Sequence, residues 1–459
     1  MAVYIAIARH IQQWRLIGVP IVKEGRWAKL IVESHNRWWE PLVLLVSGGL
    51  GVYRVLWDLI SARLSELDMT RSLQATLSRA ILERQKPRLL LHETLNEMPA
   101  DYRDLFDYRQ RIAGDAYVKR PEQDEQLQAV YREWKSTGIG ARVIISGDRG
   151  IGKSALINHF LEQLDNAEIR QLHLNPAMAN MELLQTYLNK SFPLVDGSES
   201  DKLSERIDQL PPSIIVAENI ENLLLRKIGG FEAITLLIDI ILHTSARHLW
   251  LVSCNSYSWT IAKQGVRGID CFTDAIEMEG MSEEEIAHMV MERHGLAHTR
   301  KPDFTQLQFS AKSKKYVHSA EGNQKAQQLY FRILWSYTRG NPRHALYHWK
   351  NSLVWEKDQV AVQLFAVPQQ KILERLQDGS LMLLAALIEH NGLTLTGLGE
   401  VMNTTETIAL RRIEEISSYS MVYAVEDADG ESWHVDSFWF KSVENYLVKR
   451  QFLFHGGQL

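Results

Sequence analysis

The sequence has few cysteines, no long uncharged run and no large excess of charge of either sign. Cys254 and Cys271 are the two cysteines among 459 residues, too few for a disulfide framework or a structural zinc site. The net charge of −5 gives no sign of a basic surface made to neutralise nucleic-acid phosphates. No cleavable signal peptide is apparent. We therefore expect a cytoplasmic protein of roughly three globular domains.

The first 65 residues are rich in tryptophan and contain an uncharged run of 13 residues, 41–53. A membrane-spanning helix needs about 20 apolar residues, so this run is short. Basic residues outnumber acidic ones eight to four in this region, and tryptophans flank the run. For residues 38–60 we leave three interpretations open: a buried helix, a helix at a membrane surface or oligomer contact, and a true span. Residues 66–114 are expected to form a helical connector.

The stretch GDRGIGKS, residues 147–154, follows an apolar strand and precedes an amphipathic helix. Its spacing is that of a phosphate-binding loop, G-x-x-x-x-G-K-[ST], in which main-chain N–H groups surround phosphates at a helix N-terminus. Lys153 is expected to reach the β- and γ-phosphates of ATP, and the Ser154 hydroxyl to bind Mg²⁺. The nucleotide-binding residues assigned here are Gly147, Asp148, Arg149, Gly150, Ile151, Gly152, Lys153, Ser154 and Ala155.

Three more apolar strands are expected downstream, at residues 168–174, 213–217 and 248–253, with a polar surface loop at 192–212. Strands that alternate with helices predict a parallel sheet, and ligands bind at the carboxyl ends of such strands. Glu218 follows the third strand and is expected to contact Mg²⁺ through water. Glu221 could orient a water molecule, and Asn255, after the fourth strand, could bind the γ-phosphate.

The segment GNPRHAL, residues 340–346, has the pattern of a helix start, with Asn341 as the cap and Pro342 at the first position. Arg343 then falls in the first turn, where the helix dipole disfavours a cation. An arginine at this position indicates an anionic partner, such as a phosphate group.

The last 93 residues, 367–459, have the element order of a winged helix. We expect helices at 371–390, 398–402 and 404–418, a hairpin of 421–425 with 433–435, and a helix from 438 to about 450. Acidic residues outnumber basic ones thirteen to seven from residue 368 onward. Because nonspecific DNA affinity depends on phosphate neutralisation, a protein-contact or autoinhibitory role is favoured over DNA binding.

Taken together, residues 115–459 resemble the AAA+ ATPases, in particular the origin-recognition-like and STAND branch of P-loop NTPases. The resemblance depends on an entry segment with Arg120, on GDRGIGKS, on IIVAEN at 214–219, on Asn255, and on GNPRHAL before a terminal winged helix. It implies an ATPase core at 115–280, a helical lid at 281–366, and a homo-oligomer. It also implies that Arg120 binds the nucleotide, that Asn255 is a sensor and Arg343 a lid residue, and that an arginine finger exists, for which Arg267 is the candidate.

The sequence departs from this family at the end of its second motif. The family usually has Asp-Asp or Asp-Glu there, whereas this chain has Glu218 and Asn219. Glu221 could replace the base, hydrolysis could be slow, or Glu218 could be the base with Ala217 on the metal side. Three functions follow: a switch that hydrolyses ATP, a scaffold that binds ATP with little turnover, and a DNA-loaded ATPase of the origin or transposition type.

Overall fold

The structure is a computed structural model that describes residues 98–106, 117–164, 167–193, 202–244, 246–297, 299–305, 307, 320–355, 360–427 and 430–454. The chain divides into two compact units, and each is described separately. Unit 1 comprises Met1–Arg103, His294–Arg339 and His348–Ala366; unit 2 comprises Asp104–Arg293, Gly340–Tyr347 and Val367–Leu459. The expected lid, 281–366, therefore contributes to both units. The expectations for residues 38–60 and the rest of 1–65 lie outside the described residues.

Unit 2 contains a parallel sheet of five strands in the order β2-β3-β4-β1-β5. The strands are β1 (Ala141–Gly147), β2 (Ile169–His173), β3 (Ile214–Glu218), β4 (Leu249–Asn255) and β5 (Asp274–Met278). This confirms the predicted α/β P-loop fold. Strand β1, which the glycine-rich loop follows, is an inner strand of the sheet, between β4 and β5. The edge strand β5 was not predicted, because only its third and fifth residues are buried and the apolar signal is weak.

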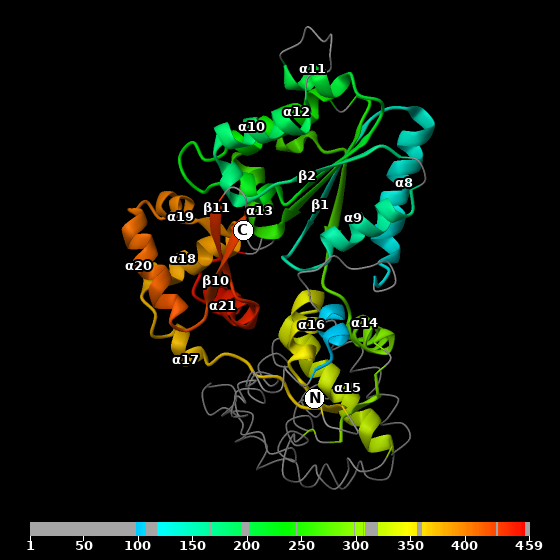
Figure 1. Ribbon diagram of the computed structural model, residues 1–459, viewed down its shortest axis with the longest axis vertical. Coiled ribbons are helices and arrows are strands. Elements are labelled where there is room, and N and C mark those ends of the chain that lie inside the picture. The colour runs from blue at the N-terminus through cyan, green and yellow to red at the C-terminus, as the bar shows by residue number, and fades with distance from the viewer. Residues whose placement is uncertain are drawn as a thin grey trace, which may run out of the picture. The chain divides into compact units, whose positions relative to one another are not determined.

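Helices cover both faces of this sheet, because successive side chains of each strand point to opposite faces. On β3, Ile214 and Val216 pack in one apolar cluster, and Ile215 and Ala217 in another. The first cluster includes α8 (Pro121–Thr137) and α9 (Lys153–Glu162); the second includes α10 (Met181–Ser191), α12 (Glu232–Thr244) and α13 (Ser256–Gly265). Figure 1 shows α8 and α9 on one side of the strands and the other three helices opposite.

The loop expected at residues 192–212 contains a short helix, α11 (Leu203–Asp208). Its Ile207 is fully buried, and Arg206 is buried beside it. The Arg206 guanidinium donates to the Phe192 carbonyl oxygen at 3.0 Å and to the Asn189 side chain. Because arginine is usually exposed, its burial could not be expected from the sequence, and the helix was not predicted.

The C-terminal module, defined here as residues 370–449, combines five helices with a three-stranded antiparallel sheet in the order β10-β11-β9. Its elements are α17 (Gln370–Leu373), α18 (Asp378–Glu389), β9 (Leu393–Thr394), α19 (Leu395–Val401), α20 (Glu406–Ser417), β10 (Val422–Asp427), β11 (Gly430–Val435) and α21 (Ser437–Lys449). The predicted single helix at 371–390 is wrong. Helix α17 ends at Leu373 and α18 begins at Asp378, although Leu373, Leu376 and Leu381 are all buried.

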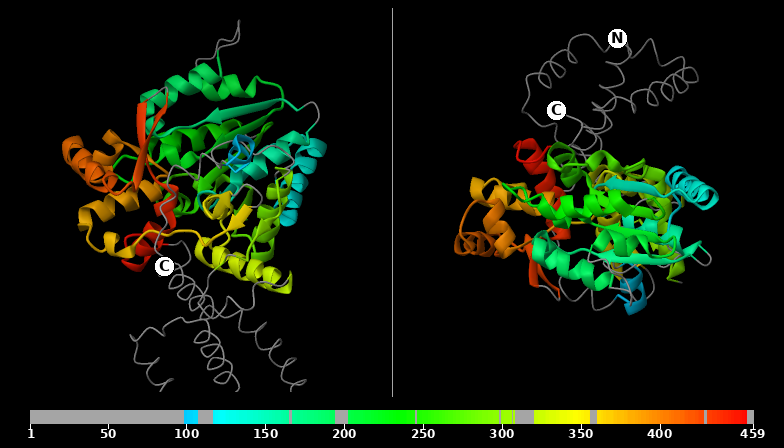
Figure 2. Two further views of the ribbon diagram at one scale, coloured as in Figure 1. Left: turned by 60° about the horizontal axis from the view of Figure 1, so that its bottom comes forward. Right: turned by 90° about the horizontal axis from the view of Figure 1, so that it is seen from above.

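The C-terminal module packs against the layer that contains α13. Helix α18 contacts α13, while β9 and β11 contact the short helix η2 (Pro176–Ala179). The module lies beside this layer in the views of Figures 1 and 2. Two further short helices belong to the same unit, η3 (Ile220–Leu223) after β3 and η4 (Ile269–Cys271) before β5.

Unit 1 has an aromatic core around α15 (Ala320–Thr338). The rings of Tyr330, Phe331 and Trp349 contact one another, and Trp349 Nε1 donates to Tyr102 Oη at 2.9 Å. The unit also contains α7 (Ala100–Leu105) and a sheet of β6 (Pro302–Asp303), β8 (Val360–Val362) and β7 (Leu353–Trp355). This sheet was not predicted. Helices α14 (Glu283–Leu296) and α16 (Pro342–Lys350) cross the boundary between the units.

Within the ranges given above, no helix has the length and apolar character that a membrane span requires.

Candidate functional site: the phosphate loop and its neighbours

The candidate loop runs from the end of β1 at Gly147 to the start of α9 at Lys153. Gly150 and Gly152 have φ angles of +81° and +114°, a backbone region that side chains with a Cβ rarely adopt. Gly152 occupies the cap position of α9 and has no side chain to satisfy the first N–H groups of the helix. The loop and the helix end therefore have the geometry of an anion site.

Lys153 is buried, and its ammonium group lies inside the loop. Its Nζ donates to the main-chain oxygens of Gly147 at 2.7 Å and Asp148 at 3.2 Å. Burial lowers the pKa of this amine, and the nearby carboxyl of Glu221 opposes that shift. The loop thus holds the lysine at the place where a bound phosphate would need a positive charge.

The first turn of α16 lies directly against the loop. Asn341 Nδ2 donates to the Arg149 carbonyl oxygen at 2.8 Å, and the Arg343 N–H donates to the Gly150 oxygen at 3.3 Å. The Arg343 charge is close enough to Lys153 to help lower its pKa. Helix α16 begins at Pro342, as predicted from the sequence. Arg343, which we expect to bind a phosphate group, therefore lies beside the loop.

The Arg120 side chain supports the loop by donating hydrogen bonds to main-chain oxygens. Its Nη2 donates to the Ile151 oxygen at 3.2 Å and its Nη1 to the Glu279 oxygen at 2.9 Å. The guanidinium is buried, and burial lowers its pKa. The Arg120 guanidinium thus links the loop to the segment after β5, and its contact with a nucleotide stays a prediction.

Of the two candidate acids, Glu221 lies nearer to the loop. The main-chain N–H of Asn255, which pairs with Gly147 in the sheet, donates to Glu221 Oε2 at 3.2 Å. Glu221 is only 1% exposed, and burial raises its carboxyl pKa against the effect of Lys153. Glu218 is half-buried and ends β3 opposite His173. The geometry therefore favours Glu221 as the acid that acts close to Lys153.

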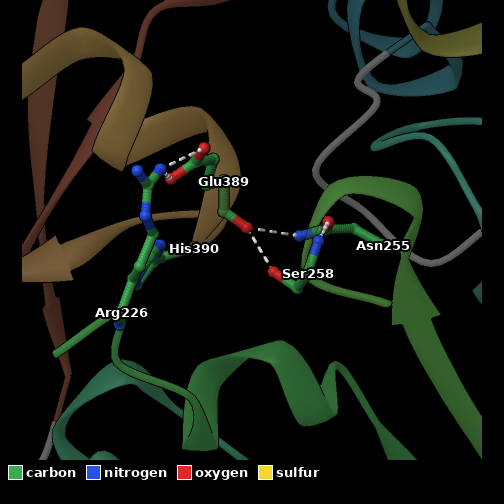
Figure 3. A network of polar contacts seen from close by, with 5 residues as sticks. All are labelled: Arg226, Asn255, Ser258, Glu389 and His390. Atoms are coloured by element: carbon green, nitrogen blue, oxygen red, sulfur yellow. Dashed lines mark hydrogen bonds and ion pairs between the residues drawn. The ribbon is translucent and has the colours of Figure 1, made fainter. Parts of the chain in front are cut away.

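The Asn255 side chain lies between Ser258 and Glu389 (Figure 3). Its Oδ1 accepts from the Ser258 N–H at 2.8 Å and caps α13, while its Nδ2 donates to the Glu389 carbonyl oxygen at 3.1 Å. Both ends of the side chain are thus bonded within the protein. Contact of Asn255 with a γ-phosphate stays a prediction.

Arg267 is exposed and lies outside the loop region. It lines an open cavity of about 520 Å³ together with Glu232, Asp239 and apolar side chains. No residue of the phosphate loop lines this cavity. That Arg267 acts as an arginine finger at the phosphate loop of a neighbouring subunit stays a proposal.

The side chains around the loop fit a magnesium-bound triphosphate. Arg149 Nη1 is buried and has no hydrogen-bond partner, so it can donate to a further anion. Ser154 is exposed in the first turn of α9 and offers a hydroxyl oxygen, a ligand that Mg²⁺ accepts. Ala155 follows Ser154 in that turn and is half-buried.

Three side chains that the C-terminal module brings to this region were not foreseen. Phe440 lies 5.9 Å from the Arg149 guanidinium, His434 lies near Arg149 and Arg343, and Asn391 Nδ2 donates to Glu221 Oε1 at 3.4 Å. An asparagine before a glycine signals a turn, which Asn391 makes with a φ of +58°. It does not indicate a contact with residue 221.

Gly150→Ala is expected to lower the affinity for ATP at least about tenfold. The new Cβ would lie 2.5 Å from the Arg343 Cβ, so the loop or α16 must shift, which costs about 1–3 kcal/mol, and 1.4 kcal/mol is tenfold in affinity. The control is Gly138→Ala, because Gly138 has a φ of +68° but no atom within 4 Å of its Cβ position. Fluorescent ATP-analogue titrations that give equal losses for both variants would disprove the close approach of Arg343.

Comparison of the sequence with protein-family models and with curated proteins gave no match. Among solved structures, Aeropyrum pernix ORC2 in ADPNP–ADP complexes is 13% identical, with 76% of this chain and 98% of that chain covered and a TM-score of 0.46. Drosophila ORC bound to DNA is 11% identical (83% and 99% covered, TM-score 0.31), and a single-residue variant of Thermotoga maritima RuvB is 13% identical (73% and 98% covered, TM-score 0.30). The chain is thus similar to these structures over most of its length, with low sequence identity and with TM-scores below 0.5.

Proposed function

We propose that the chain is an AAA+-type ATPase that works as a nucleotide-dependent switch. The observation that carries this proposal is the convergence of the buried Lys153 amine, the unpartnered Arg149 Nη1 and the first turn of α16 on one glycine loop. Positive groups and main-chain N–H groups at a helix N-terminus bind the phosphates of nucleotides.

In this proposal Lys153 and Arg149 neutralise the phosphate oxygens, and Arg343 joins them from α16. A bound Mg²⁺ would add positive charge between the phosphates, with Ser154 as its protein ligand and Glu218 as a contact through water. Glu221 would orient the attacking water or accept its proton. Its raised pKa suits a general base, because the best base titrates near the working pH.

A scaffold that binds ATP with little hydrolysis is the second candidate. Two hydrogen bonds hold the buried Glu221 carboxylate, one from Asn255 N–H and one from Asn391 Nδ2. Asn219, at the position where the family has its base, lacks a group that can take a proton. Both observations favour slow turnover.

We further propose that the switch forms a homo-oligomer and contacts a protein partner through its C-terminal module, which we interpret as a winged helix. Helix α20 exposes Ile408 and Leu410 beside Glu406 and Glu414. An acidic, partly apolar helix is poorly suited to DNA phosphates. DNA affinity at low salt that rises with ATP would contradict this assignment. Contact of residues 38–60 with a membrane surface stays a separate proposal, testable by liposome pelleting.

Two measurements on the purified full-length chain separate the candidates: equilibrium ATP binding and phosphate release with Mg²⁺. The switch predicts saturable binding with phosphate release that Glu221→Gln abolishes. The scaffold predicts the same binding with no release above the Lys153→Ala background. Absence of saturable ATP binding would overturn both.

A further inference from the structure

The end of α18 and the turn after it bond to two polar residues of the proposed ATPase site, Asn255 at the end of β4 and Glu221 in η3. The Glu389 carbonyl oxygen accepts from Asn255 Nδ2 at 3.1 Å and from the Ser258 hydroxyl (Figure 3). Two residues later, Asn391 Nδ2 donates to Glu221 Oε1 at 3.4 Å. We name residues 389–391 the latch.

An ion pair fixes the latch to the loop that follows Glu221. Arg226 Nη1 lies 2.9 Å from both carboxylate oxygens of Glu389, and the Arg226 N–H donates to His390 Nε2 at 3.0 Å. The Glu389 side chain is 9% exposed and that of Arg226 is 59% exposed, so a buried carboxylate pairs with a guanidinium that solvent reaches. Figure 3 shows Arg226 and Asn255 approaching Glu389 from opposite sides.

Apolar contacts fasten the same segments to the C-terminal module. Leu225, beside Arg226, and Tyr257, two residues after Asn255, both belong to the apolar core of that module. Tyr257 Oη also donates to Glu444 Oε1 at 3.1 Å. The chain segments just beyond β3 and β4 are therefore both tied to the C-terminal module, so movement of the module is transmitted to Glu221 and Asn255.

We propose that the latch withholds Asn255 and Glu221 from the nucleotide, and that Arg226 and Glu389 are the positioning residues that keep it closed. This proposal rests on the proposed ATPase function. Asn255 Oδ1 caps α13, so the amide nitrogen is the group left to donate to a γ-phosphate oxygen, and in this conformation the Glu389 oxygen, 3.1 Å away, holds that nitrogen. ATP then competes with the latch, whereas ADP, which lacks the γ-phosphate, does not.

The test compares Arg226→Ala and Glu389→Gln with the wild-type full chain. Each variant weakens the ion pair and should thereby open the latch. We therefore expect the ratio of ATP affinity to ADP affinity to rise about fivefold, which is the lower end of the range by which one site typically changes the affinity of another. We expect kcat for ATP to rise by a similar factor, with ADP affinity unchanged. Arg226→Lys keeps the charge and should restore values near those of the wild type.

Lys227→Ala is the matched control. Lys227 pairs with Glu400 at 2.8 Å, so it joins the same loop to the same module, but its partner lies outside the latch. An unchanged ATP-to-ADP ratio in Arg226→Ala and Glu389→Gln would overturn the latch, and so would an equal rise in Lys227→Ala. If the latch alone is wrong, wild-type ATP binding still requires Lys153. If the ATPase proposal is wrong, saturable ATP binding is absent and both proposals fall.

Discussion

Replacing Lys153 with alanine is expected to lower the affinity for ATP about 100-fold and to abolish phosphate release. The Lys153 ammonium is buried within the loop, where its two acceptors are main-chain oxygens of Gly147 and Asp148. A charge-assisted hydrogen bond contributes up to about 3 kcal/mol, which corresponds to roughly two decades of affinity. Titration of a fluorescent ATP analogue measures the loss directly.

Lys190→Ala is the control for this prediction, because it removes an exposed lysine of α10 that takes no part in the loop. Thermal unfolding of both variants shows whether the fold is kept. A folded Lys153→Ala protein that binds ATP as tightly as the wild type would show that the loop does not hold phosphates.

Replacing Arg267 with alanine is expected to lower turnover about 1000-fold at protein concentrations at which the chain assembles. An arginine donated to a phosphoryl-transfer site by a neighbouring subunit stabilises the charge of the transition state and contributes at least about 10³ in rate. Arg267 is exposed, and its cavity contains no phosphate-loop residue. ATP affinity should therefore stay within about twofold of the wild type, because Arg267 acts on another chain.

A mixing experiment makes this prediction sharper. A Lys153→Ala chain keeps Arg267, and an Arg267→Ala chain keeps its phosphate loop, so an equal mixture should recover part of the turnover that each variant lacks alone. Lys263→Ala is the control, since Lys263 is an exposed cation near Trp259 on the preceding helix. Turnover that is independent of protein concentration, with no recovery on mixing, would show that Arg267 is not donated between subunits.

Much of the sheet and loop could be predicted from the sequence, because local patterns determine them. Strands β1, β3 and β4 are apolar runs, and the glycine spacing before Lys153 specifies both a turn and a helix start. Strand β5 exposes alternate residues and resembles a polar segment. The short strands of unit 1 were missed for a related reason, since two or three residues are too few for a periodic signal.

The contacts of the candidate site were less predictable, because they join residues far apart in the chain. Asn255 was placed correctly at the end of β4, but its bond to the Glu389 oxygen depends on how α18 docks against α13. The contact of Asn391 with Glu221 spans 170 residues, and no local pattern indicates it. Arg120 was recognised by resemblance, yet its link between the loop and the segment after β5 follows from carbonyl positions that only the folded chain provides.

The central claim is that this loop binds ATP, and calorimetric titration of the full-length protein with ATP and Mg²⁺ tests it most directly. We predict saturable binding of one ATP per chain, displaced by ADP and lost in Lys153→Ala. Absence of saturable binding up to about 1 mM ATP, near −4 kcal/mol in binding free energy, would contradict the account.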